Sequence, residues 1–224
     1  MKIGRDYNIV GILIMLGGIF IPIFSIFMYI THQNVRFGLA FLIFTLFITL
    51  ERVWENFFTT KDKKPKRLYG NWTFPLVSAG YIILGIIVIG DFYINNTLND
   101  IGLAILGSCF LCLSIYVRLL SMYVLGKQWS THAHGAQKVK HIRLVKIGPY
   151  KYIRHPIYSS VFLEVFGFSL VANSLYGFLC ALLINVPLQI LRAYIEEGAS
   201  LRRFGNAYKK YIKEVPAFIP YRIY

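Results

Sequence analysis

Six long apolar segments, separated by short polar stretches, account for most of the chain. A helix rises about 1.5 Å per residue, so about 20 apolar residues cross a hydrocarbon core about 30 Å thick. The six segments comprise residues 9–30, 37–50, 76–90, 101–125, 158–172 and 176–190. We therefore expect an all-α integral membrane protein with about six transmembrane helices.

The second, fifth and sixth segments are shorter than the usual span, at about 14 or 15 residues each. Only the short turn at residues 173–175 separates the last two, which predicts a short helical hairpin. Either this hairpin is tilted and does not fully cross the membrane, or flanking residues lengthen its helices. A helix that is apolar on all sides has no periodicity from which to read its ends.

The composition excludes an ordinary soluble domain. Hydrophobic residues make up 56% of the chain and charged residues only 15%, whereas about a quarter of the residues in a soluble domain are charged. The mean hydropathy is +0.55. The lipid bilayer is thus the first expected partner.

The distribution of lysine and arginine predicts the orientation in the membrane. If the N-terminus is cytoplasmic, all but two of the 24 cations fall in cytoplasmic segments, the exceptions being Arg36 and Arg118. This asymmetry obeys the positive-inside rule, so both termini are expected in the cytoplasm. The net charge of +14 then fits a basic face against anionic lipid, including the run from Lys61 to Arg67. No nucleic-acid module is visible, and we expect no nucleic-acid partner.

Residue types that bind or catalyse are concentrated in the C-terminal half. We therefore divide the chain into residues 1–125, a four-helix scaffold on the acceptor side, and residues 126–224, a catalytic region with a cytoplasmic cofactor-binding part. Three cysteines lie in apolar segments and are expected to act as small hydrophobes, namely Cys109, Cys112 and Cys180.

No metal site is predicted. Three histidines lie among the cations that follow the fourth apolar segment, namely His132, His134 and His141. A zinc site needs further ligands, and no cysteine or carboxylate lies close in sequence to supply them. Solvated histidines at the membrane interface are the expected interpretation.

Residues 148–158 form a polar and aromatic entrance to the fifth segment. Gly148 and Pro149 predict a turn, and Pro156 disfavours a helical conformation at His155, so this backbone should be irregular. One interpretation is a helix start whose aromatic residues anchor it at the membrane interface. The other is a binding site, because Arg154, His155 and the tyrosines are groups that a polar, partly anionic ligand requires.

Arg192 and Glu196 are four residues apart and can meet across one helical turn, with Glu197 adjacent. If the pair is exposed, it contributes only about 0.3 to 0.5 kcal/mol. Two adjacent acids among so many cations would alternatively hold an ammonium or sulfonium group.

Arg118 and Glu164 are charges set within apolar segments. Both lie about 9 to 10 Å from the predicted inner ends of their segments, so they can pair. An unpaired charge at such a depth costs about 2.5 to 3.5 kcal/mol. Arg118 could instead extend to the interface, but Glu164 is shorter, so we expect a contact that lines the path of the acceptor.

Four motifs occur in a characteristic order over residues 125–220. They are Gly-Pro-Tyr, Arg-His-Pro-x-Tyr, Arg-x-x-x-Glu-Glu and Phe-Gly-x-x-Tyr-x-x-Tyr. In this order and spacing the region resembles the isoprenylcysteine carboxyl methyltransferase family and its phospholipid methyltransferase relatives. One departure is Ile142, where that family often has a histidine; His141 is shifted by one position.

The resemblance implies an enzyme that uses S-adenosylmethionine to methylate a lipophilic, lipid or prenylated acceptor at the cytoplasmic face. The acceptor group would be a carboxylate of the isoprenylcysteine type or a lipid amine. It further implies a catalytic pair, Arg192 and Glu196, and a set of cofactor-binding residues, namely Gly148, Tyr150, Arg154, His155, Pro156, Tyr158, Glu196 and Glu197.

An NADPH-dependent membrane sterol or steroid reductase is the alternative. Such enzymes resemble the same C-terminal region, including an Arg-x-His-Pro-like segment and a tyrosine-rich tail. The adjacent acids Glu196 and Glu197 favour the methyltransferase.

Overall fold

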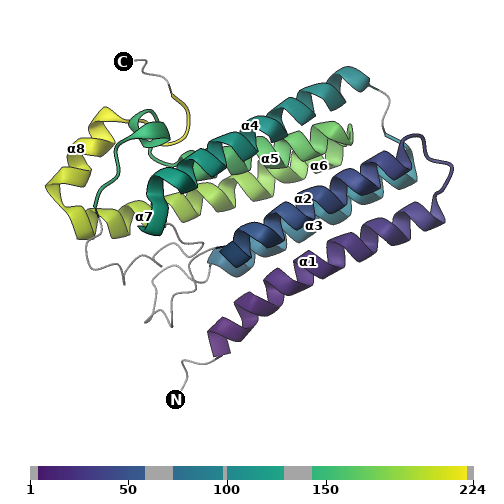
Figure 1. Ribbon diagram of the computed structural model, residues 1–224, viewed down its shortest axis with the longest axis horizontal. Coiled ribbons are helices and arrows are strands. Elements are labelled where there is room, and N and C mark those ends of the chain that lie inside the picture. Colours follow the sequence, from purple (N-terminus) through teal and green to yellow (C-terminus); the bar gives the residue numbers. More distant parts are fainter. Residues whose placement is uncertain (1–4, 59–72, 98–99, 129–142, 221–224) are drawn as a thin grey trace.

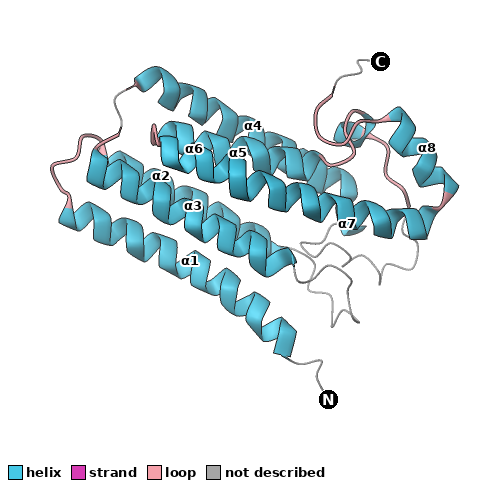
Figure 2. Cartoon of the chain, turned by 180° about the vertical axis from the view of Figure 1, so that it is seen from behind, coloured by secondary structure: helices cyan, strands magenta, loops and turns pink. Residues whose placement is uncertain are grey.

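In a computed structural model of the protein, the described residues are 5–58, 73–97, 100–128 and 143–220. Within these ranges all regular structure is helical and no strand occurs, which confirms the all-α prediction (Figures 1 and 2). The long helices are α1 (Arg5–Thr31), α2 (Gly38–Phe58), α3 (Thr73–Asn95), α4 (Ile101–Leu125), α5 (Pro156–Val171) and α7 (Val186–Phe204), and the six-residue helix α6 (Leu175–Cys180) precedes α7. Short elements are η1 (Gly126–Gln128), η3 (Gly148–Lys151), η4 (Ala181–Asn185) and α8 (Asn206–Glu214).

The long helices run up and down beside one another. α1 lies at one edge and packs against α2 and α3, while α4 pairs with α5 (Figure 1). The end of α4, the start of α5 and the end of α7 lie at the same end of the bundle, next to α8. The residue types that carry chemistry are therefore gathered at one end.

Among the described residues, three helices are long and apolar enough to cross a membrane, namely Pro75–Asn95, Ile101–Leu125 and Leu175–Phe204. Two shorter apolar helices are Gly18–Thr31 and Pro156–Val171. The expected count of six spans therefore stays a prediction, as do the domain boundary at residue 125 and the location of the termini.

The predicted hairpin is present, but its second arm is twice as long as expected. α6, the π-helical turn η4 and α7 form one continuous helix of 30 residues, Leu175–Phe204, about 45 Å long. Of the two alternatives, the structure therefore shows that flanking residues lengthen the second helix, which continues past the end of the apolar run near residue 190, and a short second arm was wrong. α7 continues as a helix with buried and exposed faces and ends at Gly205, whose φ is 54°.

Flanking residues lengthen α2 in the same way. The predicted segment ended at Leu50, before Glu51 and Arg52, whereas the helix continues to Phe58. Both charged side chains are used inside the bundle, as described below.

α4 and α5 cross closely because both have glycine at the crossing. A Cβ atom added at Gly107 would lie 2.6 Å from the carbonyl oxygen of Gly167, and one added at Gly167 would lie 2.9 Å from that of Gly107. Small residues allow helix backbones to approach in this way. Farther along the same contact, the Ser114 hydroxyl donates to the Ser160 carbonyl oxygen at 2.6 Å.

Candidate active site

The entrance to α5 is irregular, as predicted. η3 starts at Gly148, whose φ is 56°, and a Cβ atom added there would lie 2.8 Å from Val124. His155 has φ −122° and ψ 59°, outside the helical region, and α5 begins at Pro156. The chain thus turns back beside the end of α4 and enters α5 with Arg154 and His155 held in extended or loop backbone.

The C-terminal segment holds this entrance in place. We call residues 215–220 the C-terminal strap. The Arg154 N–H donates to the Pro216 carbonyl oxygen at 2.8 Å, and the His155 N–H donates to that of Ala217 at 2.9 Å. The Ser159 hydroxyl donates to the Phe218 carbonyl oxygen at 2.7 Å. The strap therefore satisfies backbone donors that precede the helix.

Glu197 of α7 joins the entrance to the long helix. Its Oε1 atom accepts hydrogen bonds from Arg154 Nε at 2.8 Å and from His155 Nε2 at 3.0 Å. Arg154 also donates to the carbonyl oxygens of Ile212 and Val215. Three residues that the sequence placed in the site are thus brought together around one carboxylate.

Arg192 and Glu196 form the predicted pair, and Tyr158 joins them. Arg192 Nε lies 3.8 Å from Glu196 Oε1 and donates to the Tyr158 hydroxyl at 3.0 Å. The Tyr158 hydroxyl in turn donates to Glu196 Oε1. Because only 7% of Arg192 is exposed, this is not a surface ion pair. We call Arg154, His155, Tyr158, Arg192, Glu196 and Glu197 the C-terminal cluster.

Aromatic rings lie beside the C-terminal cluster. The His155 ring centroid is 5.6 Å from that of Tyr158 and 5.5 Å from that of Phe218. The sequence analysis did not predict Phe218 as a site residue, because a single phenylalanine in a tail segment does not indicate a binding site.

Tyr211 of α8 contacts Tyr150, another residue that the resemblance assigns to cofactor binding. Tyr150 is buried, and the Tyr211 hydroxyl donates to its carbonyl oxygen at 2.5 Å. Burial raises the pKa of Tyr208 to about 12, and it also raises the pKa of Tyr150 and of Tyr211 above their ordinary value. These hydroxyls therefore stay protonated near neutral pH.

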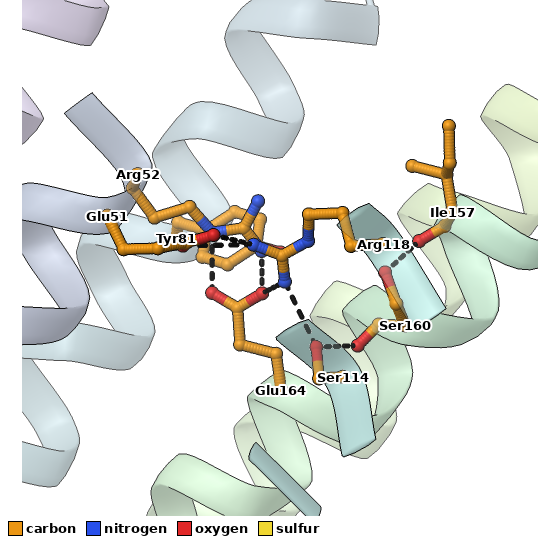
Figure 3. Close-up of polar contacts among 8 residues, drawn as sticks. All are labelled: Glu51, Arg52, Tyr81, Ser114, Arg118, Ile157, Ser160 and Glu164. Atoms are coloured by element: carbon orange, nitrogen blue, oxygen red, sulfur yellow. Dashed lines mark hydrogen bonds and ion pairs between the residues drawn. The ribbon is translucent and has the colours of Figure 1, made fainter. Parts of the chain in front are cut away.

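A second polar cluster lies inside the bundle, and we call it the interhelical ion network (Figure 3). Arg118 of α4 contacts Glu164 of α5, so the predicted pair is formed. Only 1% of the Arg118 side chain is exposed, which excludes its extension to the interface. Arg118 also donates to Ser114 Oγ at 3.0 Å.

Two residues of α2 complete this network, and the sequence analysis did not predict them. Arg118 lies 3.0 Å from both carboxylate oxygens of Glu51. Arg52 Nε donates to Glu164 Oε1 at 2.6 Å, and Arg52 also donates to the Tyr81 hydroxyl of α3 at 3.1 Å. Two arginines and two glutamates thus tie α2, α4 and α5 together (Figure 3).

Some predicted features lie outside the described residues. These are His132, His134 and His141, and the basic run from Lys61 to Arg67. Within the ranges that the structure describes, no three His, Cys, Asp or Glu side chains lie together as a metal site. Cys109 and Cys112 are exposed on α4 and Cys180 is buried.

Comparison with known proteins supports the resemblance carried by the motifs. Residues 103–207, from α4 into α8, match a model of the phospholipid methyltransferase family, so the resemblance predicted for the C-terminal half is confirmed. The chain is also 32% identical, over 130 residues, to the protein-S-isoprenylcysteine O-methyltransferase of Schizosaccharomyces pombe. This similarity covers 58% of the chain and 54% of the relative, so it spans about half the length of the protein it matches. The matches do not favour the reductase alternative.

Proposed function

We propose that the chain is a membrane methyltransferase that uses S-adenosylmethionine to methylate a lipophilic acceptor at the cytoplasmic face. The acceptor group is a carboxylate of the isoprenylcysteine type or a lipid amine. The observation that carries this proposal is the C-terminal cluster, in which cations, carboxylates and aromatic rings meet at one end of the bundle.

The chemistry of the C-terminal cluster fits this cofactor. S-adenosylmethionine supplies an activated methyl group on a sulfonium, and it also carries a carboxylate, an ammonium and an adenine. Glu196 and Glu197 are suited to the cationic groups, and Arg154 and His155 to the carboxylate. The rings of His155, Tyr158 and Phe218 offer faces for the adenine or for a cation.

The protein's contribution would be binding, alignment and exclusion of water. A carboxylate acceptor needs no general base, so holding donor and acceptor about 3 to 3.5 Å apart supplies most of the effect. An amine acceptor must also lose a proton, and Glu196 or His155 lies in the C-terminal cluster to accept it.

The proposal is tested on detergent-purified protein. Isothermal titration should show binding of S-adenosylhomocysteine and none of NADPH; the reverse result would assign the reductase instead. The protein is then incubated with radiolabelled S-adenosylmethionine and native membranes, followed by base treatment. Volatile methanol indicates a methyl ester, stable label indicates N-methylation, and no lipid or protein label would contradict methyl transfer.

We also propose six crossings with both termini cytoplasmic, and labelling can test this. Cys109, Cys112 and Cys180 are first replaced by alanine, and single cysteines are introduced at Lys64, Asn96 and Tyr224. An impermeant maleimide should label Lys64→Cys and Tyr224→Cys only from the cytoplasmic side, and Asn96→Cys only from outside. Labelling of Asn96→Cys and Tyr224→Cys from one side would require a different number of crossings.

A further inference from the structure

The buried face of the long helix carries polar side chains beyond the C-terminal cluster. Gln189 and Asn185 lie on this face, one and two turns before Arg192, and each is at least 96% buried. Residues three and four apart on a helix lie beside one another. Asn185, Gln189, Arg192 and Glu196 therefore form one polar stripe, which starts in the apolar part of the helix and ends in the C-terminal cluster.

The two amides of the stripe differ in their surroundings. Asn185 Oδ1 lies 3.0 Å from the position that a Cβ atom would take at Gly80 of α3, and Asn185 Nδ2 lies 3.5 Å from the Cys180 carbonyl oxygen. Asn185 is therefore packed against α3 at the π-helical turn. By contrast, the Gln189 amide has no hydrogen-bond partner within the described part of the chain.

The amide keeps the little accessible surface that this buried side chain has, since it is not among the fully buried polar atoms that lack a partner, so a bound group can reach it. The one-turn spacing to Arg192 puts Gln189 next to the C-terminal cluster on the side of the apolar segment. We propose that Gln189 is an acceptor-binding residue, whose amide N–H donates to an anionic oxygen of the lipophilic acceptor. This inference rests on the proposed function and adds to it the residue that recognises the acceptor.

The order of the polar side chains along the stripe supports an acceptor that carries an anionic oxygen. From the apolar part toward Gly205 the helix presents Gln189, then the cation Arg192, and only afterwards the acids Glu196 and Glu197. A group held by a lipid tail on the apolar side meets a donor and a cation before it meets a carboxylate. Both a prenylcysteine carboxylate and the phosphate of an aminophospholipid supply such an oxygen.

The test compares Gln189→Met, which keeps the side-chain length, with Gln189→Glu, which replaces the donor by a negative oxygen. Initial rates are measured with an S-prenylated N-acylcysteine and with phosphatidylethanolamine, and the substrate that the wild type methylates identifies the source of the oxygen. Ile190→Leu, at an exposed neighbouring position, is the control. S-adenosylhomocysteine affinity is measured for every variant.

We expect Gln189→Met to raise the acceptor KM about ten- to a hundredfold, the loss of one hydrogen bond to a charged group. Gln189→Glu should raise it further, while kcat and S-adenosylhomocysteine affinity stay within about twofold. An unchanged acceptor KM in both variants, or tighter acceptor binding by Gln189→Glu, would overturn the inference and leave the proposed function standing. A wild type that binds S-adenosylhomocysteine but methylates neither substrate would overturn both.

Discussion

Alanine at Arg192 or at Glu196 is expected to abolish most methyl transfer while the protein still accumulates in the membrane. Each substitution removes one partner of a triad whose members contact one another through the Tyr158 hydroxyl. Truncating one partner of a buried, hydrogen-bonded charge pair costs about 2 to 5 kcal/mol, because the other charge is left without compensation. At about 1.4 kcal/mol per tenfold, kcat/KM should fall at least thirtyfold.

Lys210 and Glu214 of α8 are the matched control for these substitutions. They form an ion pair with the same four-residue spacing at 3.7 Å, but their side chains are 76% and 46% exposed. Exposed pairs of this kind contribute about 0.3 to 0.5 kcal/mol, so Lys210→Ala should change kcat/KM by less than about threefold. Equal effects at the two pairs, measured as kcat/KM with expression matched, would show that Arg192 and Glu196 have no special part in the reaction.

The local features of the site could be predicted from the sequence. The conformational restrictions at Gly148 and Pro156 act on neighbouring residues, and the Arg192 to Glu196 spacing is fixed by one helical turn. What the sequence could not show was the register between α5 and α7, which sets the Tyr158 hydroxyl between these two charges. The position of Phe218 likewise depends on the backbone hydrogen bonds of the C-terminal strap to residues 154 and 155.

α2 and the long helix both extend beyond their apolar segments for a common physical reason. The apolar runs stop at Leu50 in α2 and near residue 190 in the long helix, and both helices continue with charged residues. A charged side chain interrupts an apolar run in the sequence, but it does not end a helix. The free-energy cost of burying the charge is offset by oppositely charged partners on other helices. Arg52 pairs with Glu164, and Glu51 pairs with Arg118. The depth of charges along single segments predicted only the contact between Arg118 and Glu164.

Loss of one charged member of the interhelical ion network should destabilise the protein, and loss of an oppositely charged pair should cost less than the two single losses together. Arg118→Gln removes the cation that contacts both Glu51 and Glu164, and we expect it to lower the free energy of unfolding in detergent by about 3 to 5 kcal/mol. Glu164→Gln should lower the free energy of unfolding by less, because the glutamine side chain is polar and its oxygen can still accept a hydrogen bond from Arg52.

The double variant Arg118→Gln with Glu164→Gln should be less destabilised than the sum of the two single variants, by about 0.5 to 3 kcal/mol. The reason is that each single substitution leaves the network of two arginines and two glutamates with a net charge, whereas the double substitution leaves one arginine and one glutamate and no net charge. Denaturant or thermal unfolding measures this coupling, and Arg36→Gln, which changes an exposed arginine, controls for the loss of a cation. If the network also lines the acceptor's path, the changes in acceptor KM will be non-additive in the same way. If the changes in KM are additive while the changes in free energy of unfolding are not, the network only holds α2, α4 and α5 together.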